Sequence, residues 1–171
     1  EKTVKGNLRE GSTICFAHGF AVAFGQIDTG SYEMILVAPK GQGGKVRESF
    51  LSGSGVPALM GSSSEKGMET ALAIAHALGS LRVGGFRTTF REEAVSDLFG
   101  EQAVLCGGVT ALIKAAFDTL VEAGFRPEVA YFECMHELKI IVDIFYARGM
   151  SGMREVISKT AAYGGLKYGE D

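Results

Sequence analysis

The first half of the chain consists of short apolar runs separated by turn-forming residues. The clearest runs are residues 13–17 and 34–38, and a histidine-glycine or proline-lysine pair follows each one. Short apolar runs bounded by turn signals are typical of buried strands, and apolar residues on both faces favour parallel pairing. Residues 56–60 and 86–90 are weaker candidates for further strands. The pattern predicts a sheet whose strands are joined by loops and helices.

A helical repeat occupies residues 64–79. Its apolar positions lie three and four residues apart and form one broad face, made of Met68, Ala71, Leu72, Ile74, Ala75 and Leu78. The glycines at positions 41, 43 and 44 predict a flexible loop between the second strand and this helix. Residues 1–89 therefore have the pattern of the later β-α-β portion of a Rossmann-type α/β sheet. The opening of such a sheet is expected before Glu1.

Long helices are predicted from about Glu92 onward. The first covers residues 92–123 with a break at Gly107-Gly108, the second covers residues 127–148, and the third covers residues 153–163. The second helix is apolar on most of its faces, so it must be buried nearly all round. Residues 90–171 are too few to cover it, which indicates a partner subunit. The expected fold class is α/β for residues 1–89, followed by an all-α, knotted-type dimerisation domain.

Composition and charge exclude several classes of protein. Hydrophobic residues make up 46% of the chain and charged residues 22%, which argues against disorder. A net charge of −3 leaves no broad basic surface for nucleic acid. The unbroken apolar runs are too short to cross a bilayer. The cysteines at positions 15, 106 and 134 form no CxxC pair, which fits reduced thiols in a cytoplasmic protein.

Two pairs of acidic residues lie four positions apart: Asp97 with Glu101, and Glu133 with Glu137. On a helix this spacing puts both carboxylates on one face, where their repulsion costs about 0.2–0.5 kcal/mol. A bound cation would offset that cost. Carboxylate oxygens without cysteine or several histidines suit Mg²⁺ or Mn²⁺. Both pairs have apolar neighbours, and burying an unpaired carboxylate is costly, so the setting favours a functional role.

Other interpretations fit the same residues. Both acid pairs could be solvated helix faces. Glu133 and His136 form a Glu-x-x-His run, a motif that di-iron carboxylate bundles use twice. Because the helix of Asp97 has no histidine, His136 is interpreted as a packing residue or as a support for the ligands. A non-catalytic helical module that binds metal and dimerises is a further alternative.

Four segments resemble the ketol-acid reductoisomerase family. Residues 90–108 and 130–139 closely resemble its metal-binding segments, and the motifs Phe-Ala-His-Gly-Phe at 16–20 and Ala-Pro-Lys at 38–40 match two more, in the family's order. The similarity extends over about residues 8–163, and the helical ending suggests the class I, bacterial-type form. No G-x-G-x-x-G fingerprint follows a strand in this sequence. The chain is therefore expected to be a fragment that lacks the N-terminal dinucleotide-binding motif and the C-terminal end.

The resemblance implies metal-binding roles for both acid pairs. Asp97 would bridge two Mg²⁺ ions, and Glu101 would bind one of them. Glu133 and Glu137 would serve the second ion, and in the family such residues come from the partner subunit. The implied assembly is a homodimer, or a higher homo-oligomer, with a shared active site and with no nucleic-acid or membrane partner.

The resemblance also implies roles for five further residues. His18 would lie near the nicotinamide, and Lys40 would bond to the metal-bound water network; both are candidate catalytic residues. Ser158 would hold the substrate carboxylate, and Cys106 would line the site. Gly43 would contact the dinucleotide, although Gln42 and Gly44 stand where the family usually has proline and histidine.

The implied reaction has two steps. An alkyl group migrates in 2-acetolactate or 2-aceto-2-hydroxybutyrate while Mg²⁺ polarises the oxygens. NADPH then reduces the product to a 2,3-dihydroxy acid, a step of valine, isoleucine and leucine biosynthesis. The resemblance therefore implies an NADPH- and Mg²⁺-dependent enzyme, and the isolated chain would be inactive if its nucleotide motif is missing.

Overall fold

The computed structural model describes residues 7–169, which form two compact units. The first unit extends to Gln102 and the second begins at Ala103. Each unit is described by itself below. A small mixed sheet followed by helices agrees with the predicted order of an α/β part and an all-α part.

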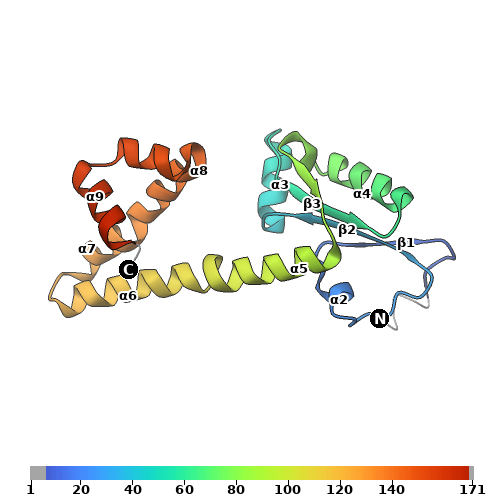
Figure 1. Cartoon of the computed structure of the whole chain (residues 1–171), viewed down its shortest axis with the longest axis horizontal. Coiled ribbons are helices and arrows are strands. Elements are labelled where there is room, and N and C mark those ends of the chain that lie inside the picture. Colours follow the sequence, from blue (N-terminus) through green and yellow to red (C-terminus); the bar gives the residue numbers. More distant parts are fainter. Residues whose placement is uncertain (1–6, 170–171) are drawn as a thin grey trace. The chain divides into compact units, whose positions relative to one another are not determined.

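A four-stranded sheet forms the centre of the first unit (Figure 1). Its strands, in the spatial order β1-β2-β3-β4, are β1 (Thr13–Phe16), β2 (Glu33–Pro39), β3 (Ala58–Ser62) and β4 (Gly85–Arg87). The β1–β2 pair is parallel, as predicted. The β3–β4 pair is parallel too, but β3 is antiparallel to β2.

The antiparallel pair has a simple cause in the connection between the two strands. The chain leaves β2 at Pro39 and enters β3 at Ala58, and these two residues are partners in the register. Lys40 also donates its backbone N–H to the Pro57 carbonyl at 2.8 Å. The connection therefore starts and finishes at the same end of the two strands. In a parallel pair the connection has to cross to the opposite end of the sheet. Apolar periodicity carries no information on this choice.

Helix α4 (Glu65–Ala77) covers one face of the sheet and confirms the amphipathic helix predicted there (Figure 1). Ser64 caps it by accepting a hydrogen bond from the Gly67 N–H at 2.9 Å. Its buried face packs on alternate residues of β2 and on β3, and together they form the core cluster Ile35, Val37, Met60, Met68, Ala71 and Ala75.

Two predictions in the connections were wrong. The glycine loop ends at Gln42, because Gly43 begins helix α3 (Gly43–Leu51). Glycine is a poor helix former and α3 is mostly exposed, so neither propensity nor periodicity indicated this helix. The last strand is shorter than residues 86–90, because Thr89 caps the next helix by accepting from the Glu92 N–H at 3.0 Å. A short helix, α2 (Phe20–Ala23), and a 3-10 turn, η1 (Ser80–Arg82), were also not predicted.

The first long helical stretch is not a uniform α-helix. Helix α5 (Phe90–Phe99) passes into a π-helical segment, η2 (Gly100–Leu105). A turn at residues 106–107 follows, and α6 (Gly108–Glu122) begins there, which confirms the predicted break. Residues 90–122 are long and apolar enough to cross a membrane by composition, unlike the unbroken runs considered above. Lys114 and Asp118 form an ion pair within this stretch.

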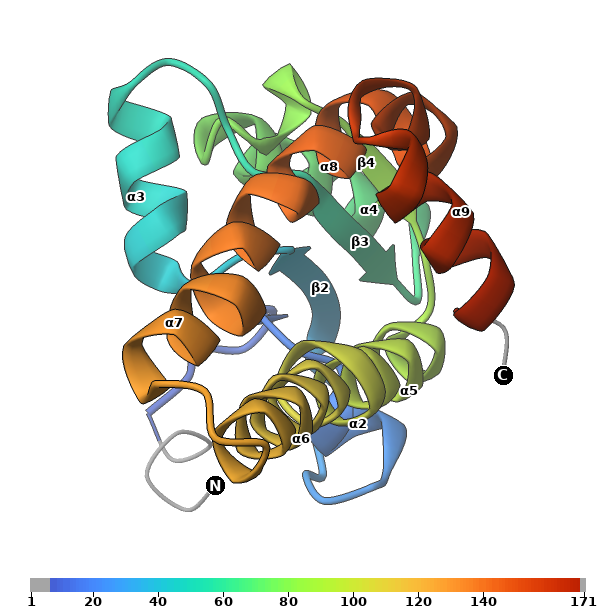
Figure 2. The same cartoon turned by 90° about the vertical axis from the view of Figure 1, so that its left-hand side faces the viewer.

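The second unit continues with α7 (Pro127–Tyr131), a second π-helical segment η3 (Phe132–His136), α8 (Glu137–Val156) and α9 (Lys159–Tyr168). Gly149 interrupts α8 with a φ of 71°. The prediction of a third helix over residues 153–163 was wrong, because the chain changes direction between α8 and α9 (Figure 2). Ser158 caps α9 at that point. The sequence did not reveal this break, because a serine within a helical pattern can also occupy a position inside a helix.

Large apolar side chains of the second unit are exposed in the single chain. The most exposed are Tyr146 at 87%, Leu112 at 68%, Leu105 at 67%, Tyr168 at 66% and Met150 at 64%. Among the described residues of this unit, Ala130 is the one buried apolar residue of the core. Large exposed apolar patches on soluble proteins mark interaction sites.

A substitution of Glu33 tests how much its hydrogen bonds to the end of β3 stabilise the first unit. Its carboxylate accepts hydrogen bonds from Ser62 Oγ at 2.8 Å and Ser63 Oγ at 3.3 Å, close to the N-terminus of α4. The bond from Ser62 lowers the pKa of Glu33 more than burial raises it. We expect Glu33→Gln to reduce the free energy of unfolding at pH 7 by less than about 1 kcal/mol. A carboxyl with a lowered pKa stabilises above its unfolded pKa, so the difference between the two proteins should vanish as pH falls through the folded pKa. Urea unfolding along a series of decreasing pH values measures this, and a difference that does not shrink as the pH falls would contradict it.

Candidate functional site

His18 and Lys40 follow the carboxyl ends of two neighbouring strands. His18 lies two residues after β1, and Lys40 directly follows β2. Because β1 and β2 are parallel, their carboxyl ends meet at one edge of the sheet. Open α/β sheets bind their ligands at this edge. The fold of the first unit therefore brings together two residues that are 22 positions apart in the sequence.

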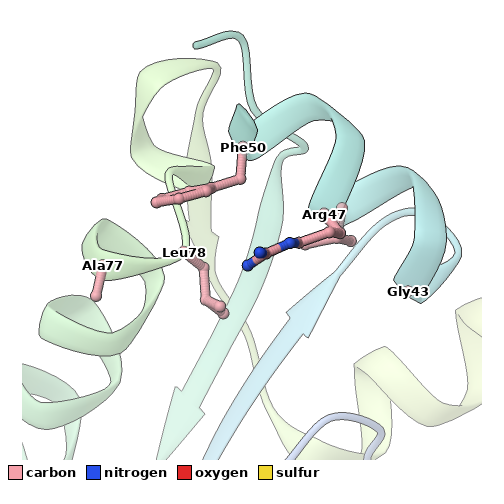
Figure 3. A pocket seen from close by; sticks show the side chains of 6 residues that line it. Gly43, Arg47, Phe50, Ala77 and Leu78 are labelled. Atoms are coloured by element: carbon pink, nitrogen blue, oxygen red, sulfur yellow. The ribbon is translucent and has the colours of Figure 1, made fainter. Parts of the chain in front are cut away.

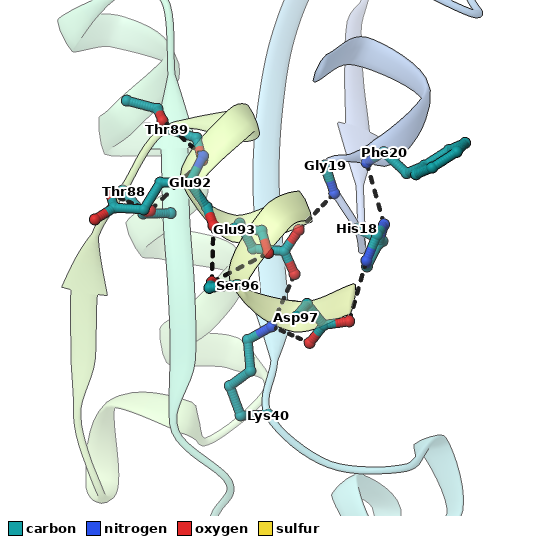
Figure 4. A network of polar contacts seen from close by, with 10 residues as sticks. All are labelled: His18, Gly19, Phe20, Lys40, Thr88, Thr89, Glu92, Glu93, Ser96 and Asp97. Carbon is teal, nitrogen blue, oxygen red and sulfur yellow. Dashed lines mark hydrogen bonds and ion pairs between the residues drawn. The ribbon is translucent and has the colours of Figure 1, made fainter. Parts of the chain in front are cut away.

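Helix α5 supplies the acidic side of the same site (Figure 4). Lys40 Nζ donates to Glu93 Oε1 at 2.8 Å and to Asp97 Oδ1 at 2.7 Å. The other Asp97 oxygen, Oδ2, lies 3.0 Å from His18 Nε2. Both oxygens of Asp97 are thus engaged, one by an ammonium group and one by an imidazole. Glu93 and Asp97 lie four residues apart on α5, so both face the sheet edge.

The protonation of His18 follows from its second contact. The Phe20 N–H donates to His18 Nδ1 at 3.1 Å, so Nδ1 acts as an acceptor. In a neutral imidazole the proton then lies on Nε2, from which it is donated to Asp97. The backbone after β1 therefore selects the tautomer that points a proton at the carboxylate.

Glu93 links all the parts of this network. Its side chain is fully buried, and its second oxygen accepts the Gly19 N–H at 2.6 Å. A Cβ at position 19 would overlap the Phe90 carbonyl oxygen, so only glycine permits this close approach of the loop to α5. Glu93 thus holds Lys40 with one oxygen and the His18 loop with the other.

The charges of the network shift two pKa values in opposite directions. Burial raises the pKa of Asp97, but the hydrogen bond and charge of Lys40, with a contribution from His18, outweigh it and leave this pKa below its ordinary value. Burial lowers the pKa of Lys40, but the bonds to Asp97 and Glu93 outweigh it and raise this pKa. The Asp97 contribution to stability is lost as pH falls through its folded pKa, and the Lys40 contribution as pH rises through its own. Asp97 and Lys40 therefore both carry their charges near neutral pH.

The donor set suits a hard divalent cation. His18, Glu93 and Asp97 each offer one ligand atom, and these three atoms lie within 4.8 Å of one another. Lys40 already places a positive charge against both carboxylates, so a bound cation would have to share these oxygens with the ammonium group. Carboxylate oxygens favour Mg²⁺ or Mn²⁺ over softer metals.

Sequence reasoning missed Glu93, although a signal for it exists. Glu93 precedes Asp97 by four residues, the same spacing that singled out Asp97 with Glu101. Its neighbour Glu92 is exposed and accepts from Thr88 Oγ1 at 2.7 Å, so adjacent glutamates here have different surroundings. The position of α5 against the sheet decides which of the two is buried.

The structure does not bring every predicted site residue into this network. Glu101 is exposed in η2, and Cys106 is exposed in the turn after it. Glu133 lies in η3 and Glu137 begins α8; both line an open hollow of about 370 Å³ in the second unit. In the single chain both acids are exposed, and so are most of their apolar neighbours, so their predicted functional role stays a prediction. Ser158 accepts the Ala161 N–H at 3.1 Å as the cap of α9.

Gly43 lies at a separate place in the first unit. It begins α3 and lines a hollow of about 330 Å³ together with Arg47, Phe50, Ala77 and Leu78 (Figure 3). Nothing lies within 4 Å of a Cβ built at position 43. The backbone at Gly43 is therefore open to approach, and its predicted contact with a dinucleotide stays a prediction.

Lys40 tests the electrostatic balance of the site. The change Lys40→Met leaves Glu93 buried without its cation and removes one partner of Asp97. We expect it to lower the free energy of unfolding by about 3 kcal/mol, at the low end for breaking a buried pair because the Lys40 side chain is 32% exposed. The control Lys45→Met breaks an exposed pair with Glu48 and should cost less than about 0.5 kcal/mol. Urea unfolding of both variants measures the difference, and equal losses would show that the network does not stabilise the fold.

Comparison with known proteins places this geometry in a family. Residues 90–171 match the family model described as the ketol-acid reductoisomerase C-terminal domain, and residues 1–84 match the acetohydroxy acid isomeroreductase NADPH-binding domain. A solved NADH-preferring ketol-acid reductoisomerase from an uncultured archean is 43% identical, with a TM-score of 0.94. That match covers 98% of this chain and 52% of the solved chain, so this chain spans about half the length of that relative.

Two more distant structures share the fold alone. A putative oxidoreductase from Jannaschia sp. CCS1 is 12% identical with a TM-score of 0.64, over 97% of this chain and 68% of that one. A semialdehyde dehydrogenase NAD-binding protein from Cupriavidus necator is 15% identical with a TM-score of 0.63, over 96% and 62%. The two family models together match almost the whole chain, and they leave the di-iron bundle without support. The chain belongs to the ketol-acid reductoisomerase family.

Proposed function

We propose that this chain carries part of the active site of a cytoplasmic ketol-acid reductoisomerase of valine, isoleucine and leucine biosynthesis. The reaction would be the Mg²⁺-dependent alkyl migration of 2-acetolactate or 2-aceto-2-hydroxybutyrate, followed by reduction with NADPH to a 2,3-dihydroxy acid. The observation that carries the proposal is the network at the sheet edge, in which Lys40 lies between Glu93 and Asp97. This arrangement presents an acidic, partly open site where a family member requires a metal site.

Asp97 and Glu101 would hold the metal from this chain. Asp97 is 22% exposed at its side chain and Glu101 is exposed, so solvent can reach both carboxylates. Two Mg²⁺ ions, when bound, would polarise the hydroxyl and carbonyl oxygens of the substrate and stabilise the charge that develops during migration. Glu133 and Glu137 lie on the second unit and would complete such a site from the partner subunit.

Lys40 and His18 would control charge and protons around Asp97. The Lys40 ammonium offsets the charge of two carboxylates that lie close together, and it can donate a hydrogen bond to an oxygen of a bound ligand. His18 holds a proton on Nε2 within 3.0 Å of Asp97. When that contact opens, the same proton can be offered to a neighbouring oxygen.

Ser158, Cys106 and Gly43 keep the roles that the family resemblance implies. The Ser158 hydroxyl uses its acceptor lone pairs on the α9 cap, so its O–H remains available to bind a substrate carboxylate. Cys106 is an exposed thiol in the turn that follows the helix of Asp97 and Glu101, which suits a lining residue.

The nicotinamide cofactor is proposed to be NADPH. The matching family domain is described as NADPH-binding, which supports this choice, whereas the 43% identical relative prefers NADH. Both cofactors carry the same hydride. The distinction lies in the 2′-phosphate, which an arginine typically recognises. Comparing turnover with NADPH and NADH in the whole enzyme decides between them.

We further propose a homodimer, or a higher homo-oligomer, whose subunits share each site. Exposed apolar side chains on α6 and α8, such as Leu112, Tyr146 and Met150, support it. Burying each side chain of this size would contribute about 1.5–3 kcal/mol. A second copy of the chain supplies apolar surface of the same kind, and it would cover the helices that the single chain leaves open.

Metal binding tests the assignment of Asp97. Titration with Mn²⁺, followed by the loss of the free-ion electron paramagnetic resonance signal, should give an affinity for the wild type that falls at least about tenfold in Asp97→Asn, because a ligand loses its charge. The control Asp118→Asn changes an exposed carboxylate paired with Lys114 and should leave the affinity unchanged. Equal affinity in wild type and Asp97→Asn would refute the metal site.

Subunit mixing tests the shared site. Asp97→Asn and Glu137→Gln should each bind Mn²⁺ poorly, because each removes one ligand from every site. If sites are shared, mixed dimers contain one intact site, so mixing the two variants under exchange conditions should restore part of the Mn²⁺ binding. Sedimentation confirms that dimers form, and joint purification of two differently tagged variants confirms that they exchange subunits. Exchange without any recovery of binding would place each complete site within one chain.

A further inference from the structure

Both pairs of candidate metal-binding acids lie across a junction between α- and π-helix. Asp97 is in α5, and Glu101 is the second residue of η2. Glu133 is the second residue of η3, and Glu137 is the first residue of α8. The π-helix accounts for well under 1% of residues in proteins and is enriched at functional sites. Its occurrence beside both acid pairs therefore calls for a physical explanation.

The change of helix type alters how two residues four positions apart line up. An α-helix completes a turn in about 3.6 residues, so residue i+4 lies about 40° beyond residue i. A π-turn closes one residue later, with i→i+5 hydrogen bonds, so residue i+4 falls short of a full turn. When the helix changes type between the two residues, these opposite offsets partly cancel. Each junction therefore brings its two carboxylates closer to one line along the helix.

Gly108 is the first residue of α6 and follows the first π segment after the turn at residues 106–107. A Cβ at this position would overlap the Ala103 carbonyl oxygen, five residues earlier and inside η2. The overlap is with backbone, so no side-chain rotation could relieve it. Thr110 Oγ1 donates to the Cys106 carbonyl and to the Gly107 carbonyl, the latter at 3.0 Å, and so satisfies carbonyls in the turn that follows the π segment. The wide turn is thus maintained by a glycine that allows close approach and a threonine that bonds the carbonyls beyond it.

We propose that the two π segments position the paired carboxylates for a divalent cation, and that Gly108 is the positioning residue that fixes Glu101 relative to Asp97. This inference rests on the proposed function, in which Asp97 and Glu101 hold the metal. Gly108 touches neither ion nor substrate. It acts through the backbone of η2, on which Glu101 lies.

Mn²⁺ titration of the full chain tests the role of Gly108. We expect Gly108→Ala to weaken Mn²⁺ binding by about tenfold or more, the size of effect seen when the support of a metal ligand is removed. The matched control is Gly100→Ala in the same helical stretch. Gly100 has helical backbone angles and nothing within 4 Å of an added Cβ, so this change should leave the affinity intact.

A second control separates positioning from stability. Gly124 follows α6 with a φ of +89°, so Gly124→Ala strains the backbone and destabilises the chain away from η2. It should lower the unfolding temperature yet keep the wild-type Mn²⁺ affinity. Loss of affinity in Gly108→Ala together with retained affinity in Gly124→Ala would support positioning. Parallel losses that follow stability in both variants would overturn it.

Thr110→Val keeps the test decisive if Gly108→Ala does not fold. This variant preserves the shape of the side chain but removes the hydroxyl that bonds the Cys106 and Gly107 carbonyls. A several-fold loss of Mn²⁺ affinity in a folded Thr110→Val protein supports the inference, and wild-type affinity in it overturns the inference. Failure of the proposed function is distinguishable, since Asp97→Asn would then bind Mn²⁺ as well as the wild type.

Discussion

The first unit depends on one buried charge, the carboxylate of Glu93. Removing a carboxylate from water costs several kcal/mol unless it is paired and hydrogen-bonded. Glu93 meets this requirement with Lys40 from the end of β2 and with the Gly19 N–H from the loop after β1. The two strand ends and α5 are therefore held to one another by a single side chain. Asp97 and His18 occupy their positions because these three segments are already fixed.

The two units organise their polar residues differently. In the first unit the candidate site is internally balanced, since every charged member has a partner within the same chain. In the second unit Glu133 and Glu137 lie exposed beside an apolar hollow, and the surrounding helices expose large side chains. This difference fits the proposed shared site. The charges of the first unit are paired within one chain, whereas Glu133 and Glu137 of the second unit would find their partners on another copy of the chain.

Much of the fold could be predicted because its elements have strong apolar patterns. Strand β2 buries a continuous run of apolar side chains and α4 buries one helical face, so their sequences indicate them directly. Strand β1 was predicted from its apolar run, although none of its side chains is fully buried. The parallel direction of β1 and β2 was predicted, but the antiparallel direction of β3 was not, because β2 and β3 would show the same apolar pattern in either pairing. Helix α3 carries little apolar signal, and π segments such as η2 and η3 have backbone angles close to those of an α-helix.

The candidate site was predictable to a similar extent. His18, Lys40 and Asp97 were recognised from motifs, and the fold brings these three together. Glu93 was missed because one glutamate beside another resembles a solvated helix face, and burial is decided by how α5 packs on the sheet. Glu101, Glu133 and Glu137 are exposed in the single chain, and spacing along the sequence does not tell an exposed acid from a buried one.

The double pairing of Lys40 has an evolutionary consequence. A neutral residue at position 40 leaves Glu93 unbalanced, and a neutral residue at position 93 leaves the loop at Gly19 without its acceptor. Each single substitution therefore gives a less stable protein. Simultaneous replacement of residues 40 and 93 by a well-packed apolar pair would avoid this loss. Selection on folding alone would therefore slow divergence at positions 19, 40 and 93, even in a descendant that had lost its catalytic task.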